Sequence, residues 1–336
     1  LKRGSPNISR RATDTFMNHP DITLIITNWN GRDLLRECLP SVINAVSFDS
    51  KRSYEIMVVD DCSSDDSLEI LAREFPTIRA EKTPVNFGFH GANNYGAELS
   101  QARLIMPMNN DIKLDEDALY HLADHFAEGK DTFSVSGKFY AFDRTTFLYG
   151  NRGGYFQNGH FYLYEKAPDD SSQTHFACGG AFMVDRQRYL KLGGFDPVYH
   201  PLYYEEIDLS YRALKRGWKV LYEPKSVAYH KVQSTITKQE KGNRIGLISA
   251  RNNYLFVWKN ILDRPLTCQF LFYIPLFLIR DLFRMKSRFW IAFYMALKRL
   301  PRILKARRQE KSEVLFSDRE ILQKININLA TRRGDN

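Results

Sequence analysis

The chain has 336 residues, of which 43% are hydrophobic and 26% charged, enough for one large core or two medium ones. Its net charge is +9. The segment from Arg280 to Lys311 alone holds eleven basic and two acidic residues, a local charge of +9. The remainder is therefore close to neutral, which excludes a general nucleic-acid-binding surface and indicates one local basic segment.

The four cysteines are far apart and form no CxxC pair, which suits a reducing compartment and argues against a zinc ribbon or disulfide framework. Residues 1–20 are polar, and we expect a disordered lead-in without a secretory signal. The longest uncharged apolar stretch, Leu266 to Ile279, has 14 residues. That length is too short to span a bilayer comfortably.

The first part of the chain alternates strand and helix patterns. Asp21 to Thr27, Tyr54 to Asp60 and Arg103 to Met108 are apolar runs typical of buried strands, and apolar residues at helical spacing follow the first two. Alternating strands and helices predict parallel units with right-handed crossovers. Asn86 to Asn94 is predicted to be a loop leading into a short helix. We therefore predict a Rossmann-like half over residues 21–111.

Oxygen-rich side chains follow two of these strands. Asp60 and Asp61 end one strand, and Asn109, Asn110 and Asp111 end another. Both groups would lie at the carboxyl edge, where open α/β sheets bind ligands. A carboxylate beside amide oxygens suits a hard cation, although a local Asn/Asp turn is the alternative. The chain has no GxGxxG and no GxxxxGK[ST], which excludes the usual dinucleotide and P-loop sites.

The second part is more irregular. Phe139 to Tyr164 is rich in aromatics and glycine, which predicts hairpins and loops. Phe176 to Val184 has the pattern of a strand, and its Gly179-Gly180 pair permits close approach to a ligand or forms a bulge. Two short strands follow near residues 220–223 and 227–230. A histidine at the end of the second, His230, is either a metal ligand or an ordinary surface residue.

An acidic cluster opens a predicted helix that ends near Arg216. Glu205, Glu206 and Asp208 fall in its first turn, where the helix dipole stabilises negative charge, so an ordinary acidic helix start is one explanation. Their aromatic surroundings favour a catalytic site. Carboxylates in a partly apolar site shift each other's pKa, as a general base near neutral pH requires.

Taken in order over residues 22–232, these motifs resemble family 2 glycosyltransferases of the GT-A fold, and bacterial rhamnosyltransferase-like enzymes of surface polysaccharide synthesis in particular. The resemblance rests on segments 25–31, 58–65, 86–94, 109–111, 179–184 and 204–209. It implies an α/β fold with a mostly parallel sheet flanked by helices over 21–235. The nucleotide-binding half would be 21–111 and the acceptor half 112–235.

The resemblance also implies roles for individual residues. The nucleotide sugar would be bound by Thr27, Asn28, Asn30, Asp60, Asp61, Asn86, Gly88, Asn93, Asn109 and Asn110. A divalent cation, Mg2+ or Mn2+, would be held by Asp111, His230 and Asn109. Asn109 replaces the first acid of the DxD motif. The catalytic residues would be the general base Glu206, where an Asp is common, with Glu205 and Asp208 in support. The acceptor would face Gly179, Gly180 and Tyr204.

The implied reaction is the transfer, with inversion, of a sugar from a nucleotide-diphosphate donor to a hydroxyl of a glycan or polyprenyl-diphosphate-linked acceptor. Two alternatives stay open. A nucleotidyltransferase would carry a Gly-rich basic signature near the first strand, where the chain has only Arg32. A catalytically inactive nucleotide-sugar-binding module is favoured by Asn109 but not by the intact acidic cluster.

Residues 236–336 are predicted to form a helical, basic and amphipathic extension. Phe270 to Ile279 and Phe289 to Leu297 are apolar almost all round and flanked by Arg and Lys. Such helices suit burial at an anionic membrane surface, although core helices docked on the domain are the alternative. We therefore expect a cytoplasmic protein held peripherally on the inner face of the cell membrane, with no nucleic-acid partner.

Overall fold

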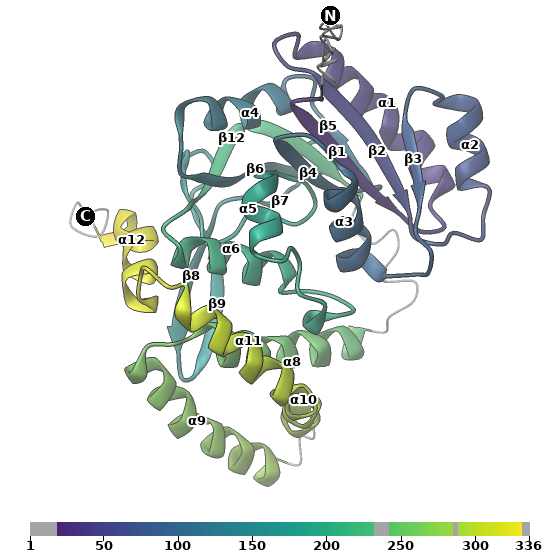
Figure 1. Cartoon of the computed structure of the whole chain (residues 1–336). Helices are drawn as coiled ribbons and strands as arrows, with labels where there is room; N and C mark the ends of the chain where they lie inside the picture. Colours follow the sequence, from purple (N-terminus) through teal and green to yellow (C-terminus); the bar gives the residue numbers. More distant parts are fainter. Residues whose placement is uncertain (1–18, 232–241, 285–287, 331–336) are drawn as a thin grey trace, which may run out of the picture.

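The computed structural model describes residues 19–231, 242–284 and 288–330 (Figure 1), so the predicted lead-in lies almost wholly outside the described residues. Within them, a ten-stranded sheet runs in the order β10-β12-β6-β11-β4-β1-β2-β3, with β5 paired to β12 and β7 to β6. Successive residues of β1 enter different cores: Ile25 packs into one hydrophobic cluster, whereas Leu24 and Ile26 pack into the other. The sheet is therefore covered on both faces, as a continuous apolar run requires.

The first half of the domain, which is predicted to bind the nucleotide, is built from parallel strands. Its elements are β1 Ile22–Asn28, α1 Arg32–Phe48, β2 Tyr54–Asp60, α2 Ser67–Glu74, β3 Arg79–Lys82, α3 Gly88–Leu99 and β4 Leu104–Asn109. Strand β1 pairs in parallel with β2 and β4, and β2 pairs in parallel with β3. The register sets Asn28 opposite Asp60 and Thr27 opposite Asn109. The strand ends predicted to carry the site therefore share one edge.

The second half completes the sheet with mixed strands. Its elements are β5 Ile112–Leu114, α4 Ala118–Glu128, β6 Thr132–Ala141, β7 Phe147–Tyr149, β8 Arg152–Gln157, β9 His160–Glu165, β10 Ser172–Gln173, β11 Phe182–Asp185, α5 Arg186–Lys191, the 3-10 helix η1 Pro197–Tyr199, α6 Glu205–Lys215 and β12 Lys219–His230. Strand β11 is antiparallel to both its neighbours, and β12 is parallel to β6. Strands β8 and β9 form a separate hairpin, within the segment predicted to hold hairpins.

Three local predictions were wrong. The predicted loop over residues 86–94 is helical from Gly88 onward, because α3 lies directly on the sheet: a Cβ on Gly96 would meet Ile25 at 2.5 Å. The predicted strand over 176–184 begins only at Phe182, which leaves the glycine pair in the turn before β11. The two short strands after residue 219 are one strand, β12, with an irregularity between Tyr222 and Val227.

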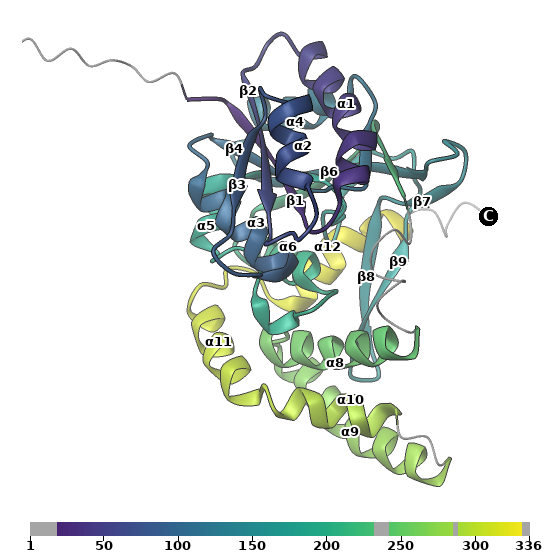
Figure 2. The same ribbon diagram turned by 90° about the vertical axis from the view of Figure 1, so that its right-hand side faces the viewer.

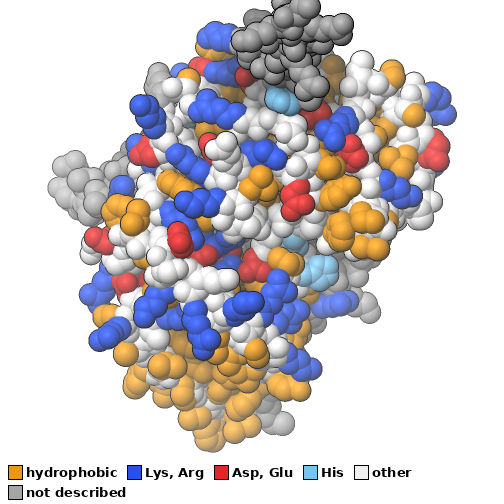
Figure 3. Space-filling view, viewed as in Figure 1, with side chains coloured by type: hydrophobic (Ala, Val, Ile, Leu, Met, Phe, Trp, Pro, Cys, Tyr) orange, Lys and Arg blue, Asp and Glu red, His pale blue; other side chains and the backbone are white. Residues whose placement is uncertain are grey.

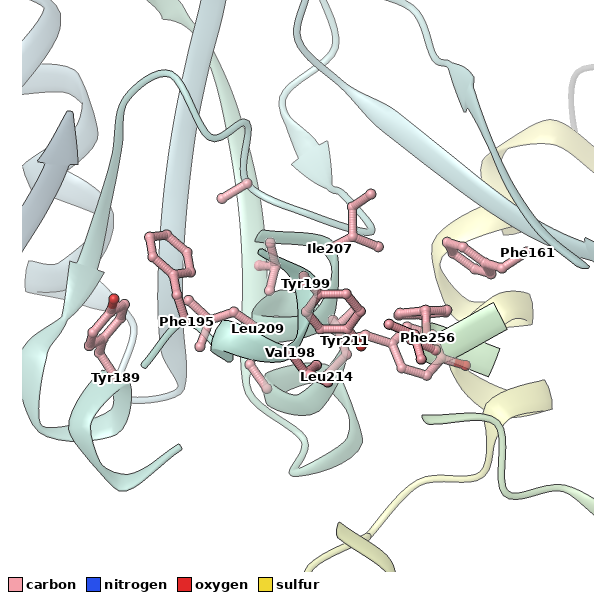
Figure 4. Close-up of a cluster of buried hydrophobic side chains, with 14 of the residues drawn as sticks. Phe161, Tyr189, Phe195, Val198, Tyr199, Ile207, Leu209, Tyr211, Leu214 and Phe256 are labelled. Atoms are coloured by element: carbon pink, nitrogen blue, oxygen red, sulfur yellow. The ribbon is translucent and has the colours of Figure 1, made fainter. Parts of the chain in front are cut away.

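The C-terminal region is helical and divides into docked and exposed helices. It comprises α8 Gly242–Asn260, α9 Arg264–Phe283, α10 Arg288–Leu297, α11 Leu300–Ser312 and α12 Asp318–Ala330. One hydrophobic cluster includes Ile25 of β1, Phe256 of α8 and Ile325 of α12. Figure 4 shows part of this cluster, with Phe256 beside Tyr211 of α6. The region therefore shares a core with the domain before it.

Helices α9 and α10 lie at the end of the molecule farthest from α1 and α2 (Figure 2). Helix α9 has 20 residues, and its most apolar 18-residue stretch has a mean hydropathy of 1.5, with only 17% of that stretch buried. By length and composition the helix is therefore able to cross a membrane. The apolar stretch predicted from sequence was shorter because it lies between Arg264 and Arg280, whereas the helix begins at Arg264 and continues past Arg280 to Phe283. Helices of this length and composition also lie along membrane surfaces.

Helix α12 is fixed to α6 by a buried charge pair. Lys215 Nζ lies 3.1 Å from Asp318 Oδ1, and both side chains are at most 1% exposed. Asp318 also accepts hydrogen bonds from the Tyr211 hydroxyl and from the backbone N–H groups of Leu262 and Asp263. The carboxylate thereby joins α6, the α8–α9 connection and α12.

Replacing Asp318 by alanine is expected to lower the free energy of unfolding by about 3–5 kcal/mol, because Lys215 is left buried without its counter-charge. Urea unfolding followed by circular dichroism measures the change. Glu313→Ala removes an exposed acid close by and serves as the control, with an expected change below about 0.5 kcal/mol. Equal effects of the two substitutions would contradict this account.

Candidate active site

Three polar side chains form a hydrogen-bonded row along the carboxyl edge of β1, β2 and β4. Asn110 Nδ2 donates to Asn28 Oδ1 at 2.7 Å, and Asn28 Nδ2 donates to Asp60 Oδ2 at 3.1 Å. Asn28 and Asp60 are at most 1% exposed. A Cβ on Gly31 would meet Asn110 Nδ2 at 2.2 Å, so glycine at this position leaves room for the row. Residues predicted to bind nucleotide from three strands are thus held together.

Two further side chains fix the loops around this row. Asn30, in the left-handed region at φ 50°, accepts from the backbone N–H of Ser64 at 2.7 Å. Asp61 accepts from the backbone N–H groups of Phe87 and Gly88 at 2.8 and 2.7 Å. Asp61 therefore stabilises the start of α3 as a carboxylate at a helix N-terminus does.

The other residues predicted to bind the donor lie at or beside the same edge, in different settings. Asn86 Nδ2 donates to the Asp61 carbonyl, whereas Asn93 is buried within α3 and donates to the Phe89 carbonyl. Thr27 lies one residue before Asn28 on β1, and Asn109 ends β4. Asn109 donates its backbone N–H to the Gly180 carbonyl at 2.9 Å, which ties the donor edge to the glycine pair.

Asp111 and His230 are adjacent, although 119 positions separate them in the sequence. Strand β12 pairs with β5 so that His230 lies opposite Ile112, and His230 Nε2 is 3.2 Å from Asp111 Oδ1. The Tyr149 hydroxyl lies 2.6 Å from His230 Nδ1 and orients the ring. Among the described residues, no group of three or more His, Cys, Asp or Glu side chains forms a metal cage.

Asp111 and His230 together fit a divalent cation that also binds phosphate. Mn2+ and Mg2+ are commonly held by one or two protein ligands, with substrate oxygens and water completing the shell. A carboxylate next to an imidazole that is oriented through its other nitrogen has the donor types and the outer hydrogen bond expected of such a ligand pair.

Two carboxyls begin α6 on the opposite side of the glycine pair. Glu206 lies so close to Gly179 that a Cβ there would meet Glu206 Oε1 at 1.7 Å. Burial and the neighbouring Glu205 raise the pKa of Glu206 well above its usual value. Burial also raises the pKa of Glu205 to about 7. Because Gly179 has no side chain, it leaves the space that the Glu206 carboxyl occupies.

His90 of α3 faces this pair. Its Nε2 is 3.5 Å from Glu205 Oε2, and both residues are at most 4% exposed. Burial lowers the pKa of His90 to about 4 despite the nearby charge of Glu206. His90 is therefore neutral at physiological pH, and it was missed in the sequence because it lies in a segment predicted to be a loop.

Asp208 lies in a different environment from Glu205 and Glu206. It accepts hydrogen bonds from Tyr199, Arg212, Lys259 and Asn260 at 2.7 to 2.8 Å and is fully buried. Burial acts to raise its pKa, but the charges of Arg212 and Lys259 outweigh burial and hold the pKa far below its usual range. Asp208 is thus an ionised anchor for α6, without the raised pKa of its two neighbours.

The loop before α6 is held in an unusual conformation by α8. Tyr203 and Tyr204 have positive φ angles of 23° and 87°, which cost energy for non-glycine residues. Asn252 Nδ2 donates to the carbonyls of Leu202 and Tyr203, each within 2.9 Å. Asn253 Nδ2 contacts the Tyr204 hydroxyl at 2.5 Å. These asparagines were not predicted, because a pair of Asn in a helix carries no distinct sequence signal.

Comparisons with known proteins identify the family to which the chain belongs. The family model for glycosyl transferase family 2 matches residues 23–193. The chain belongs to this family. The family resemblance predicted from the motifs is therefore confirmed, and the match includes the donor edge, Asp111 and the glycine pair.

Relatives include bacterial glycosyltransferases and animal polypeptide N-acetylgalactosaminyltransferases. The chain is 32% identical over 102 residues to a poly(ribitol-phosphate) beta-glucosyltransferase of Bacillus spizizenii, covering 29% of this chain and 16% of the relative. It is 24% identical over 225 residues to an N-acetylglucosaminyl-diphospho-decaprenol L-rhamnosyltransferase of Mycobacterium tuberculosis, covering 59% and 73%. Several matched relatives are much longer, and the chain spans 16% to 40% of their length.

A solved structure shows the same fold. GalNAc-T7 with UDP, GalNAc and Mn2+ superposes with a TM-score of 0.55 at 16% identity, covering 72% of this chain and 48% of that one. At this identity the likeness speaks for the fold alone. It confirms the predicted α/β architecture of the GT-A type, with a mostly parallel sheet flanked by helices.

The raised pKa of Glu206 predicts a pH-dependent effect of Glu206→Gln on stability. A carboxyl whose folded pKa is raised contributes stability below its unfolded pKa, and this contribution is lost as pH rises toward the folded pKa. The free energy of unfolding of Glu206→Gln should therefore increase relative to wild type between pH 5 and pH 8, by up to about 1.4 kcal/mol per pH unit. Urea unfolding at several pH values measures the difference.

Glu37→Gln is the matched control for this series. Hydrogen bonds from Lys231 and Lys113 lower the pKa of Glu37. A lowered pKa contributes stability above the unfolded pKa, so this variant should lose stability relative to wild type as pH rises from acid. If the free energy of unfolding of both variants changed with pH in the same direction relative to wild type, the raised pKa of Glu206 would be refuted.

Proposed function

We propose that this protein transfers a sugar, with inversion, from a nucleotide-diphosphate sugar to a hydroxyl of a glycan or lipid-linked acceptor in cell-surface polysaccharide synthesis. The observation that carries the proposal is the position of Glu206. Its carboxyl lies against Gly179, whose neighbour Gly180 is bonded through its carbonyl to Asn109 at the donor edge. Gly179 and Gly180 thus connect the Glu206 carboxyl, which is the proposed proton acceptor, to the end of β4, which leads into Asp111.

On the donor side, the hydrogen-bonded row of Asn28, Asp60 and Asn110 would receive the nucleoside. Asp111 and His230 would hold Mg2+ or Mn2+, with Asn109 close to them; the bound cation supplies neutralisation of the charge on the diphosphate leaving group. GalNAc-T7, which shares the fold, was solved with both UDP and Mn2+, and this supports the use of a cation here.

On the acceptor side, Glu206 would accept the proton of the attacking hydroxyl. A carboxyl with a raised pKa is a stronger base once ionised than one at its usual pKa. Glu205 raises the pKa of Glu206 by its charge, and Asp208 positions the helix that carries both. Gly179, Gly180 and Tyr204 border this side. Holding both substrates in place converts a bimolecular reaction into an effectively unimolecular one.

The exposed helices α9 and α10 support attachment to a membrane on the cytoplasmic side. In Figure 3 hydrophobic side chains cover the end of the molecule where these helices lie, and Lys and Arg side chains border them. Exposed members include Leu271, Phe272, Leu282, Phe283 and Tyr294, each at least 60% exposed. An apolar face bordered by cations matches the acyl chains and anionic head groups of a cytoplasmic leaflet.

The reaction is tested by turnover of a panel of nucleotide sugars with and without Mg2+ or Mn2+. Glu206→Gln should lower the transfer rate by at least about a hundredfold, because the group that accepts the proton is lost. Asp111→Asn should weaken the dependence on the cation, which titration with metal measures directly. Glu81→Gln, a carboxylate on the edge strand β3, is the control and should turn over at the wild-type rate. Full turnover by Glu206→Gln and Asp111→Asn would exclude the proposed mechanism.

Membrane attachment is tested by sedimentation with phosphatidylglycerol vesicles at low and high salt. Phe272→Asp should weaken binding at least about tenfold, because burial of a phenylalanine contributes about 1.5–3 kcal/mol. Binding should also weaken as salt rises. Leu315→Asp, a 74% exposed residue between α11 and α12, is the control and should bind like wild type. A wild-type protein that stays in the supernatant at low salt would exclude attachment.

A further inference from the structure

Two arginines and a histidine from separate segments lie between the acidic pair and the apolar end of the molecule. His200 follows η1, Arg251 lies in the middle of α8, and Arg299 joins α10 to α11. Arg251 Nη2 donates to the His200 carbonyl at 2.7 Å. The His200 ring lies 6.1 Å from the His90 ring, and His90 contacts Glu205. The Glu205 carboxyl, His90, His200 and Arg251 therefore follow one another in space.

The two arginines lack a counter-charge within the described part of the chain. No carboxylate there lies within ion-pair distance of His200, Arg251 or Arg299. By contrast, Lys259 and Arg302 nearby both contact Asp196, at 2.8 and 3.5 Å. Uncompensated charge is costly where it is buried, as at Arg251, so arginines gathered without an acid favour the binding of an anionic ligand.

The pKa values reflect this proximity. Burial and then the charge of Arg299 lower the pKa of Arg251 to about 10. Burial lowers the pKa of His200, and the charges of His90, Arg251 and Arg299 lower it further. Helix α10, which leads into Arg299, packs against α8, which carries Arg251.

The cluster is continuous with the exposed apolar face. Arg299 follows Leu297 and Tyr294 of α10, which are 40% and 60% exposed. His200 is exposed and Arg299 is half-buried, so both are able to contact a ligand, whereas Arg251 is 2% exposed and lies beneath them. The order along the molecule is therefore apolar face, cations, acidic pair.

We propose that His200 and Arg299, supported from below by Arg251, bind the diphosphate of a polyprenyl-diphosphate-linked acceptor sugar. Its lipid tail would lie along α10, and its sugar would reach Glu206. This inference rests on the proposed function, of which it specifies the acceptor class. Guanidinium groups form charge-assisted hydrogen bonds to phosphate oxygens, which are roughly twice as strong as neutral ones, and the imidazole N–H of His200 is a further donor.

The test compares binding of the full chain to two kinds of phosphatidylcholine vesicle in a flotation assay. One carries undecaprenyl diphosphate, and the other carries phosphatidylglycerol in an amount that gives the same zeta potential. Wild type should bind the diphosphate vesicles about tenfold more tightly. Arg299→Gln and His200→Gln should lose this preference and keep their binding to phosphatidylglycerol. Arg308→Gln removes an exposed charge from α11 and should retain the preference.

Equal binding of wild type to the two vesicles would mean a general anionic head-group surface and would overturn the inference. Retention of the preference by both variants would also overturn it. The diphosphate of the nucleotide sugar is the other possible ligand of the cluster, and KM values distinguish it from that of the acceptor. If Arg299→Gln raised the KM for the donor alone, the cluster would be assigned to the nucleotide sugar and the inference would be wrong. The proposed function fails separately, if Glu206→Gln keeps full turnover while the vesicle preference persists.

Discussion

The buried carboxylate of Asp208 is the constraint on which the acidic pair, and with it the proposed acceptor side of the site, depends. It joins three segments, because its partners come from η1, from α6 itself and from the end of α8. An ionised group without solvent contact is tolerated only when its charge and lone pairs are satisfied. The first turn of α6 is therefore fixed relative to α8, and Glu205 and Glu206 are fixed with it.

The two sides of the site are built by different means. The donor edge is a row of short hydrogen bonds between residues at the ends of parallel strands, and the register of the sheet supplies most of its geometry. The acceptor side depends on a strained loop and on α8, which satisfies the carbonyls of Leu202 and Tyr203. The glycine pair connects the two sides, since Gly180 bonds to Asn109 and Gly179 accommodates Glu206.

This construction relates the exposed apolar helices α9 and α10 to the acidic pair of α6. Helix α8 packs between α6 and the exposed pair α9–α10, so the helix that supports the acidic residues also supports the apolar end (Figures 1 and 2). A lipid-linked acceptor presented along α10 would reach the acidic pair past His200 and Arg299. Surface attachment then restricts the acceptor to one orientation, which contributes to rate by proximity.

The sequence by itself determined the donor half and the start of α6. Apolar runs specified β1, β2 and β4, and the polar residues after them fall on one edge because parallel strands end together. The sequence also marked Glu205 and Glu206, since acids clustered at a helix start among aromatics are a local signal. Asp208, in the same cluster, could not be distinguished from them by sequence, because its partners lie up to 52 positions away.

Only the tertiary structure decided the remaining features. Helix α3 forms in a glycine- and asparagine-rich segment because Gly96 lets it pack on β1, so packing overrides weak helix propensity. His230 meets Asp111 because β12 pairs with β5, a contact that no local pattern encodes. The support of Tyr203 and Tyr204 by Asn252 and Asn253 is likewise a contact over about 50 positions. Periodicity reports the neighbours of a residue in its own element, whereas these contacts arise only when distant elements pack.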